Sequence, residues 1–165
     1  MTLLEALRFA LRDALLVDPE VLVLGQLVKY GLGGLTEGLW ESNPKQVLTY
    51  PVCENFMHAS AMGLALAGKK PIVINERMDF MALAMDPIIN HIAVWPARSP
   101  LVRMGLVVLA VVGKGKGQGP QHSKNLTPWF RQLEGIEVVE PCSADEAYLS
   151  LTSALLYGKR PVVFV

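Results

Sequence analysis

The sequence predicts an α/β protein with a doubly wound, mainly parallel sheet that carries helices on both faces. Three observations support this fold class. Short apolar runs alternate with longer segments of helical periodicity along the whole chain. The runs lack the polar alternation of a half-exposed strand, so they are predicted to be buried on both faces. The 165 residues, of which 52% are hydrophobic and 18% charged, suffice for one domain with a large core.

The first elements of the chain follow this alternation. Thr2 and Glu5 form a capping box that opens a helix, which ends at Val17 before Asp18-Pro19. Val21–Gly25 is a short apolar run and is predicted to be a buried strand. Three further elements are expected next: a glycine-rich loop at 30–34, a short helix at 37–41 and a strand at 46–50.

The middle of the chain continues with helix, strand and helix. Residues 54–67 are small and apolar and predict a helix that Gly68 ends. Residues 71–75 predict the third strand. Residues 79–95 are predicted to be mostly helical, with Pro87 in a kink or in the first turn of a new helix, because proline cannot donate a backbone hydrogen bond.

The last third of the chain begins with a strand predicted at 106–112. A loop with four alternating glycines follows at 113–119. Ser143 is predicted to cap a helix because Glu146 stands at its third position. The remaining elements are a short helix at 127–133, a strand at 136–140, a helix at 144–157 and a strand at 162–165. We expect a single domain over residues 1–165.

Composition argues against several classes of partner. The net charge is zero and no basic block is present, so no nucleic acid is expected as a partner. No apolar run reaches the roughly 18 residues of a membrane span. Cys53 and Cys142 have no metal-binding or redox spacing, and the first residues form a helix cap rather than a signal peptide. These observations predict a cytoplasmic location, and the high apolar content favours a large partner interface.

Glu54 is the most informative residue, because it stands where a strand gives way to a helix of small residues. As a cap it would gain about 0.3–1 kcal/mol from the helix dipole. In an apolar pocket its carboxyl group would instead favour the protonated form and could hold a proton for chemistry. Residues 75–80 and 113–122 also follow strand carboxyl ends, where ligands bind in such sheets. This clustering gives the functional interpretation the same weight as the cap.

The glycine-rich loop at 113–119 has two interpretations. Its backbone amides and two lysines could cradle a phosphate, although it does not match a P-loop. Otherwise it is a mobile surface loop. His122 closes this loop and is either an exposed bystander or an acid/base group at the mouth of the sheet.

The side chains of Phe80 and His58 each have a functional and a purely structural interpretation. Phe80 follows the third strand and belongs either to the core or to a cleft where it stacks on a planar ring. Glu54 and His58 lie four residues apart on one helix face and could bind a metal together. No third ligand is evident, so a simple contact between the two is favoured and no metal site is expected.

A series of segments resembles one family in order and spacing, and together they cover essentially all of the chain. It resembles the transketolase-like pyrimidine-binding domain of thiamine-diphosphate enzymes, and most of all the N-terminal half of the 2-oxoacid (pyruvate-type) dehydrogenase beta subunit. The fold would then be the pyrimidine domain of the thiamine-diphosphate-binding fold. The segments that carry the resemblance are 1–7, 23–25, 51–54, 67–73, 86–90, 119–123 and 161–164.

The resemblance implies a role for each of four residues. Glu54 matches the glutamate that hydrogen-bonds the aminopyrimidine ring nitrogen and so promotes proton removal from the thiazolium carbon. Phe80 matches the aromatic residue that packs on the aminopyrimidine, and Val52 would line the same pocket. His122 matches a histidine near the substrate that donates a proton or anchors a carboxylate.

The chain also departs from the family pattern. Gln26 stands after the strand-end glycine, where the beta subunits usually carry an acidic residue, and a neutral amide there would weaken proton communication between paired sites. The C-terminal domain of the beta subunit is absent from this sequence. No Gly-Asp-Gly with a downstream Asn occurs, so magnesium and the diphosphate would be held by an alpha-like partner chain.

The resemblance therefore implies half of a thiamine-diphosphate site. We expect the pyrimidine-binding subunit of a split enzyme that self-associates, pairs with the alpha-like chain as a heterotetramer and acts on a 2-oxo acid or ketose. The reaction would be decarboxylation or transfer of a two-carbon acyl or ketol unit. The alternatives are a non-catalytic interaction subunit, which Gln26 favours, and a phosphate- or nucleotide-binding module built on the loop at 113–119.

Overall fold

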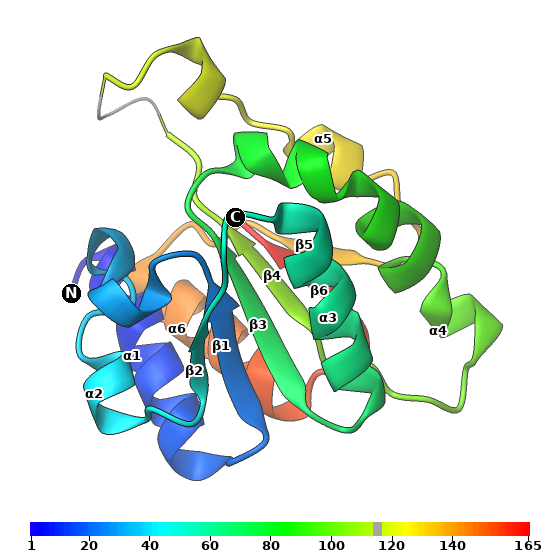
Figure 1. Ribbon diagram of the computed structural model, residues 1–165, viewed down its shortest axis with the longest axis horizontal. Helices are drawn as coiled ribbons and strands as arrows, with labels where there is room; N and C mark the ends of the chain where they lie inside the picture. The colour runs from blue at the N-terminus through cyan, green and yellow to red at the C-terminus, as the bar shows by residue number, and fades with distance from the viewer. Residues whose placement is uncertain (114–116) are drawn as a thin grey trace.

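The computed structural model describes residues 1–113 and 117–165 and confirms the predicted α/β class (Figure 1). Its six strands form one sheet in the order β2-β1-β3-β4-β6-β5. Every pairing in this sheet is parallel. The strands are β1 (Val21–Gly25), β2 (Val47–Thr49), β3 (Lys70–Asn75), β4 (Val107–Ala110), β5 (Glu137–Val139) and β6 (Val162–Phe164).

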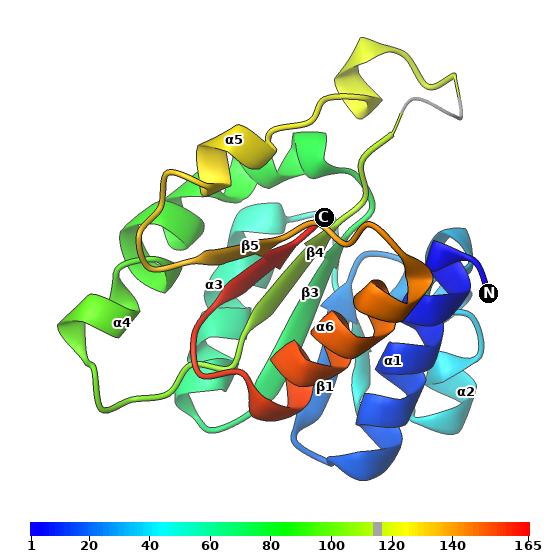
Figure 2. The same cartoon turned by 180° about the vertical axis from the view of Figure 1, so that it is seen from behind.

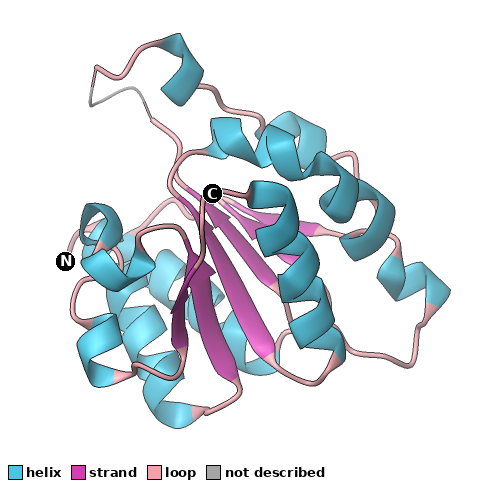
Figure 3. Ribbon diagram, viewed as in Figure 1, coloured by secondary structure: helices cyan, strands magenta, loops and turns pink. Residues whose placement is uncertain are grey.

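Helices cover both faces of the sheet, which forms the middle layer (Figure 3). Figure 2 shows α1 and α6 in front of the sheet, on the face opposite α3. The α1 face has α1 (Leu3–Val17), η1 (Val28–Tyr30), η2 (Leu32–Gly34), α2 (Leu39–Ser42) and α6 (Ala144–Tyr157). The α3 side has α3 (Glu54–Leu66), η3 (Met78–Ala84), η4 (Pro87–Ile92), α4 (Trp95–Arg98) and α5 (Thr127–Phe130), and the short turn η5 (Pro120–His122) lies beyond the sheet. Among the described residues, no helix is both long and apolar enough to cross a membrane.

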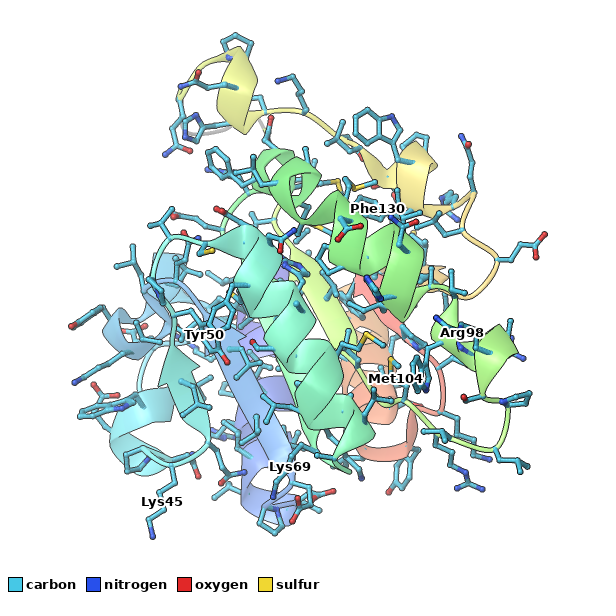
Figure 4. All side chains as sticks on the ribbon, turned by 45° about the vertical axis from the view of Figure 1, so that its right-hand side comes forward. Lys45, Tyr50, Lys69, Arg98, Met104 and Phe130 are labelled. Carbon is cyan, nitrogen blue, oxygen red and sulfur yellow. The ribbon has the colours of Figure 1, made fainter. Side chains whose placement is uncertain are left out.

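Successive residues of a strand pack alternately into two separate cores, one on each face of the sheet. Val21 and Val23 of β1 pack with α1 and α6, whereas Leu22 and Leu24 pack under α3. Such burial on both faces explains why the strands read as continuous apolar runs. Met104 and Phe130, labelled in Figure 4, are fully buried in the α3 core.

Both predicted helix caps are present. The Glu5 amide donates to Thr2 Oγ1 at 3.2 Å, and the Thr2 amide donates to Glu5 Oε2 at 2.7 Å. Ser143 Oγ accepts from the Glu146 amide at 3.1 Å. Each cap satisfies amides that the first turn of a helix leaves unpaired.

Residues 79–95 are mostly helical, as predicted, but the type of helix changes along the segment. A 3-10 helix, η3, is followed by a π-helix, η4, and then by the short α4. Pro87 lies at the start of η4, as predicted, because its missing N–H group leaves no hydrogen bond unmade there. The segment predicted as a glycine-rich loop at 30–34 instead contains the end of η1 and all of η2, because glycines with positive φ allow tight 3-10 turns there. The other predicted helices and strands occur with ends that differ by a few residues.

The strand order places a crevice at the carboxyl ends of β1 and β3. After β1 the chain adds β2 on one side, and then β3 on the other side of β1. Ligands bind at such a reversal in doubly wound sheets. The chain leaves β1 at Gly25, where an added Cβ would lie 2.6 Å from Val28 Cγ1 and 2.8 Å from the Ile74 carbonyl oxygen. Only glycine allows this close approach at the edge of the crevice.

A chain of buried polar groups ties α3 to the sheet. His58 is fully buried, and its Nδ1 lies 2.8 Å from the backbone carbonyl oxygen of Glu54. A carbonyl only accepts, so Nδ1 carries the proton and Nε2 is an acceptor. Asn75 Nδ2 lies 3.4 Å from this Nε2 and 3.3 Å from the Leu109 carbonyl oxygen. The predicted contact between His58 and Glu54 exists, but it uses the backbone carbonyl rather than the carboxylate.

We predict that His58 makes the protein less stable as the pH falls. Burial lowers the pKa of His58 below the ordinary histidine value of 6.5. The unfolded chain therefore takes up a proton first, and the free energy of unfolding should decrease once the pH falls below 6.5, by up to about 1.4 kcal/mol per pH unit. Urea denaturation between about pH 7.5 and 5.5 measures this slope.

The variant His58→Gln should show a shallower slope, because it has no imidazole to titrate. The exposed His91 provides the control, and His91→Gln should keep the parental slope. A slope in His58→Gln equal to that of the parent would show that His58 is not the group responsible.

Candidate functional site

Side chains from three elements meet in a small cavity at the carboxyl end of the sheet. The cavity has a volume of about 40 Å³. It lies at the crevice between β1 and β3 that the strand order creates. The residues that line it are Gln26, Glu54, Met57, Ile74, Asn75, Glu76, Arg77 and Phe80.

Glu54 is the first residue of α3, and its side chain is only 7% exposed. Its Oε1 accepts a hydrogen bond from Gln26 Nε2 at 3.0 Å. No side-chain cap bond is formed at the N-terminus of α3, where Cys53 is the capping residue. The carboxylate lies in the first turn of α3, lines the cavity and contacts Gln26. The functional role of Glu54 stays a prediction.

Asn75, the last residue of β3, presents an unsatisfied acceptor. Its amide nitrogen points at His58 Nε2 and the Leu109 carbonyl, and both of these groups can only accept. This fixes the orientation of the amide and leaves Oδ1 buried with no partner among the described residues. A buried, unpaired acceptor costs about 1–3 kcal/mol. A ligand with an N–H or O–H donor would satisfy it.

Phe80 and His122 meet at the rim of this region. Their rings are 5.2 Å apart at the centroids, with the planes at 83° in an edge-to-face contact. Phe80 also lines the cavity that contains Glu54. His122 is half-buried, and its Nδ1 has no partner among the described residues. The structure therefore brings His122 beside Phe80, as expected of a cluster at strand carboxyl ends, although His122 does not line the cavity itself.

Besides His122, two further candidates from the sequence are not placed in the cavity. Val52 is 80% exposed and lies outside the cavity lining. A role for Val52 in a pyrimidine pocket stays a prediction. Residues 114–116 of the glycine-rich loop lie outside the described residues, so its role as a phosphate cradle also stays a prediction.

Asn75 and Arg77 are site residues that the sequence argument did not single out. Arg77 is only 7% exposed, and its Nη2 donates to Gln118 Oε1 at 2.6 Å. Both residues follow the apolar run of β3, where a polar side chain lies at the ligand-binding edge. That position was the available signal, but the sequence does not show which polar residues at such an edge become buried.

Three exposed apolar residues are close in sequence to residues that line the cavity. Leu27, Val52 and Phe56 are 52%, 80% and 54% exposed, and Leu27 directly follows Gln26. Leu27 also has a left-handed backbone, with φ of 57°, which is costly for a residue with a side chain.

The sequence matches known proteins along its whole length. Residues 1–165 match the family model described as "Transketolase, pyrimidine binding domain". The chain is 32% identical to the mitochondrial pyruvate dehydrogenase E1 component subunit beta-1 of Arabidopsis thaliana, over 100% of this chain and 46% of that protein. It is also 32% identical to the pyruvate dehydrogenase E1 component subunit beta of Rickettsia bellii, over 100% of this chain and 52% of that protein. It thus spans about half the length of these curated relatives.

A solved structure shares the fold. It is described as a split gene transketolase in an inactive beta4 tetramer, and it aligns with a TM-score of 0.79 at 20% sequence identity, over 99% of this chain and 50% of that one. The full-length match to the family model and the parallel six-stranded sheet agree with each other. The chain belongs to the family of transketolase pyrimidine-binding domains.

Proposed function

We propose that this chain is the pyrimidine-binding subunit of a split thiamine-diphosphate enzyme that acts on a 2-oxo acid or a ketose. The observation that carries the proposal is the buried Glu54 carboxylate, which shares one cavity with Gln26 and Phe80 at the reversal point of the sheet. A buried carboxylate in a cleft is a common device for holding a proton that the chemistry needs.

The residues of the cavity fit an aminopyrimidine ring. Such a ring carries an exocyclic amine, which is a donor, and ring nitrogens, which meet a protonated carboxyl group or a donor. Asn75 Oδ1 is a buried acceptor without a partner, and Glu54 supplies the carboxyl group. Phe80 adds an aromatic surface at the same cavity. Thiamine diphosphate, when bound, supplies a carbon nucleophile that attacks the carbonyl group of the substrate.

Glu54 is the proton-holding group in this proposal. Its side chain is only 7% exposed, and its Oε1 accepts a hydrogen bond from Gln26 Nε2 at 3.0 Å. A carboxyl group held in this way at a cavity is positioned to exchange a proton with a bound molecule. The neutral amide of Gln26 cannot take up or release a proton. We therefore also propose that any proton transfer between paired sites passes through groups other than Gln26.

His122 is proposed to face the substrate as a proton donor or carboxylate anchor. Its half-buried ring contacts Phe80, so an acid/base group and the aromatic side chain lie together. The buried Nδ1 without a described partner is available to a bound molecule. Val52, exposed beside Glu54, would line the site once a second chain covers it.

A partner chain is part of the proposal. A cavity of about 40 Å³ is too small to enclose an aromatic ring by itself, and Leu27, Val52 and Phe56, which are close in sequence to its lining residues, are exposed. We propose that an alpha-like chain holds the diphosphate and magnesium, and that the two chains form a heterotetramer.

The exposed small residues Ala59 and Gly63 of α3 support self-association. Two free, exposed cysteines, Cys53 and Cys142, support a reducing compartment such as the cytoplasm.

Replacing Glu54 tests the catalytic role. In Glu54→Gln the side chain keeps its size and can still accept from Gln26, but it holds no proton. We expect kcat of the assembled enzyme to fall about 100-fold or more, with little change in the melting temperature. The exposed Glu134 is the control, and Glu134→Gln should leave kcat unchanged. Full activity in Glu54→Gln would favour a non-catalytic interaction subunit.

Cofactor binding tests the dependence on a partner. Calorimetry with thiamine diphosphate and magnesium should show no binding to this chain alone. Binding is expected after co-expression with a chain that carries Gly-Asp-Gly and is encoded nearby. Tight binding to this chain alone would contradict the split site, and no binding to either preparation would overturn the catalytic proposal.

A further inference from the structure

Arg77 is a buried arginine for which the described residues provide no anion. It lies two residues after the end of β3 at Asn75, and the next residue, Met78, donates its amide to the Val111 carbonyl at 3.1 Å. Its side chain is 7% exposed, and Nη2 donates to Gln118 Oε1 at 2.6 Å. Nε is buried and unpaired among the described residues.

A neutral amide does not compensate a buried charge. No ion pair of the described residues includes Arg77, although Glu54 and Glu76 line the same cavity. Moving a cation out of water carries a penalty of several kcal/mol unless an anion is at hand. The planar guanidinium group is suited to bind a carboxylate or a phosphate through two parallel hydrogen bonds. The unpaired Nε is one of the donors that such a contact uses.

Arg77 also lines a second, larger cavity. That cavity has a volume of about 300 Å³ and reaches the Leu32–Leu35 turn. Its walls are mostly apolar, with Leu4 and Val112 among them, and Arg77 and Glu76 belong to both cavities. Arg77 therefore borders both the cavity that Glu54 lines and a larger space with room for an anionic group.

The chemistry of the reaction limits which anionic group of the substrate Arg77 is suited to bind. In decarboxylation, the carboxylate of a 2-oxo acid leaves as carbon dioxide and loses its charge. A guanidinium group paired with that carboxylate would stabilise the substrate more than the transition state and slow the step. An anion that keeps its charge throughout contributes binding without this penalty. Arg77 is thus better suited to a group remote from the reacting carbonyl.

We infer that Arg77 selects substrates that carry a second, unreacting anionic group. This inference rests on the proposed function, and it narrows the substrate to a 2-oxo dicarboxylate or a phosphorylated ketose. Arg77 contacts the carboxylate or phosphate through Nε and an Nη atom, and Gln118 holds the guanidinium group in place. Arg77 thus determines which substrate binds, whereas Glu54 holds the proton that the reaction needs.

Substrate pairs that differ only in the remote charge test the inference in the assembled complex. One pair is 2-oxoglutarate and 2-oxopentanoate, followed by carbon dioxide release. The other is fructose 6-phosphate and fructose, followed by ketol transfer to an aldose. The parent should prefer the anionic member of one pair, which identifies carboxylate or phosphate. In Arg77→Met, the KM for that member should rise about tenfold to a hundredfold, with the KM for its partner unchanged. The KM of Arg77→Lys for the anionic member should lie between the values of the parent and of Arg77→Met.

Two controls separate this inference from the proposed function. Thiamine diphosphate should bind the Arg77→Met complex as it binds the parent, and Arg103→Met, at the opposite end of the sheet, should behave as the parent. Calorimetry of the same anionic and neutral compounds with the cofactor-free complex gives a readout that does not need turnover. Arg77-dependent binding there would support the inference even if the cofactor did not bind.

Three results would overturn the inference. The first is an equal effect of Arg77→Met on both members of each pair, and the second is a parent without preference for the anionic members. The third is loss of cofactor binding in Arg77→Met, which would assign Arg77 to the cofactor or to folding. In the first two cases intact cofactor binding and turnover would leave the proposed function standing.

Discussion

Helices cover both faces of the parallel sheet, and this constraint decides where polar side chains can lie. Strand interiors must be apolar on both sides, as the two cores of β1 show. Polar groups are therefore concentrated at the strand ends. Polar groups that are buried in the interior need a hydrogen-bond partner for each donor and each acceptor. His58 and Asn75 meet this need through a fixed order of donors and acceptors, which leaves one acceptor directed away from the network.

The site is built from this order. The backbone carbonyl of Glu54 fixes the tautomer of His58, which in turn fixes the amide orientation of Asn75. The same residue that offers its carbonyl to His58 offers its carboxylate to Gln26. Packing of α3 on the sheet and the chemistry of the cavity thus depend on a common set of hydrogen bonds. A change at His58 would affect both, although His58 does not line the cavity.

Much of this arrangement could be predicted from the sequence, because strands buried on both faces leave a strong apolar signal. The fold class, the strand positions and the placement of Glu54 at a strand-to-helix junction follow from that signal. The division of residues 79–95 into three helical pieces does not, since 3-10, α and π turns differ only in small backbone rotations. Burial of Arg77 could not be predicted either, because it depends on packing around Gln118, which lies 41 residues further along the chain.

Leu27 has a consequence for attempts to engineer this chain. Its left-handed backbone is strained by about 1–2 kcal/mol, and its side chain is half-exposed beside Gln26. Directed evolution that rewards heat resistance of the single polypeptide would exchange leucine for glycine or asparagine at this position. The winners of such a selection would lack an apolar group at the rim of the site and would assemble less well. Screening should therefore score the complete assembly rather than the heat resistance of the single chain.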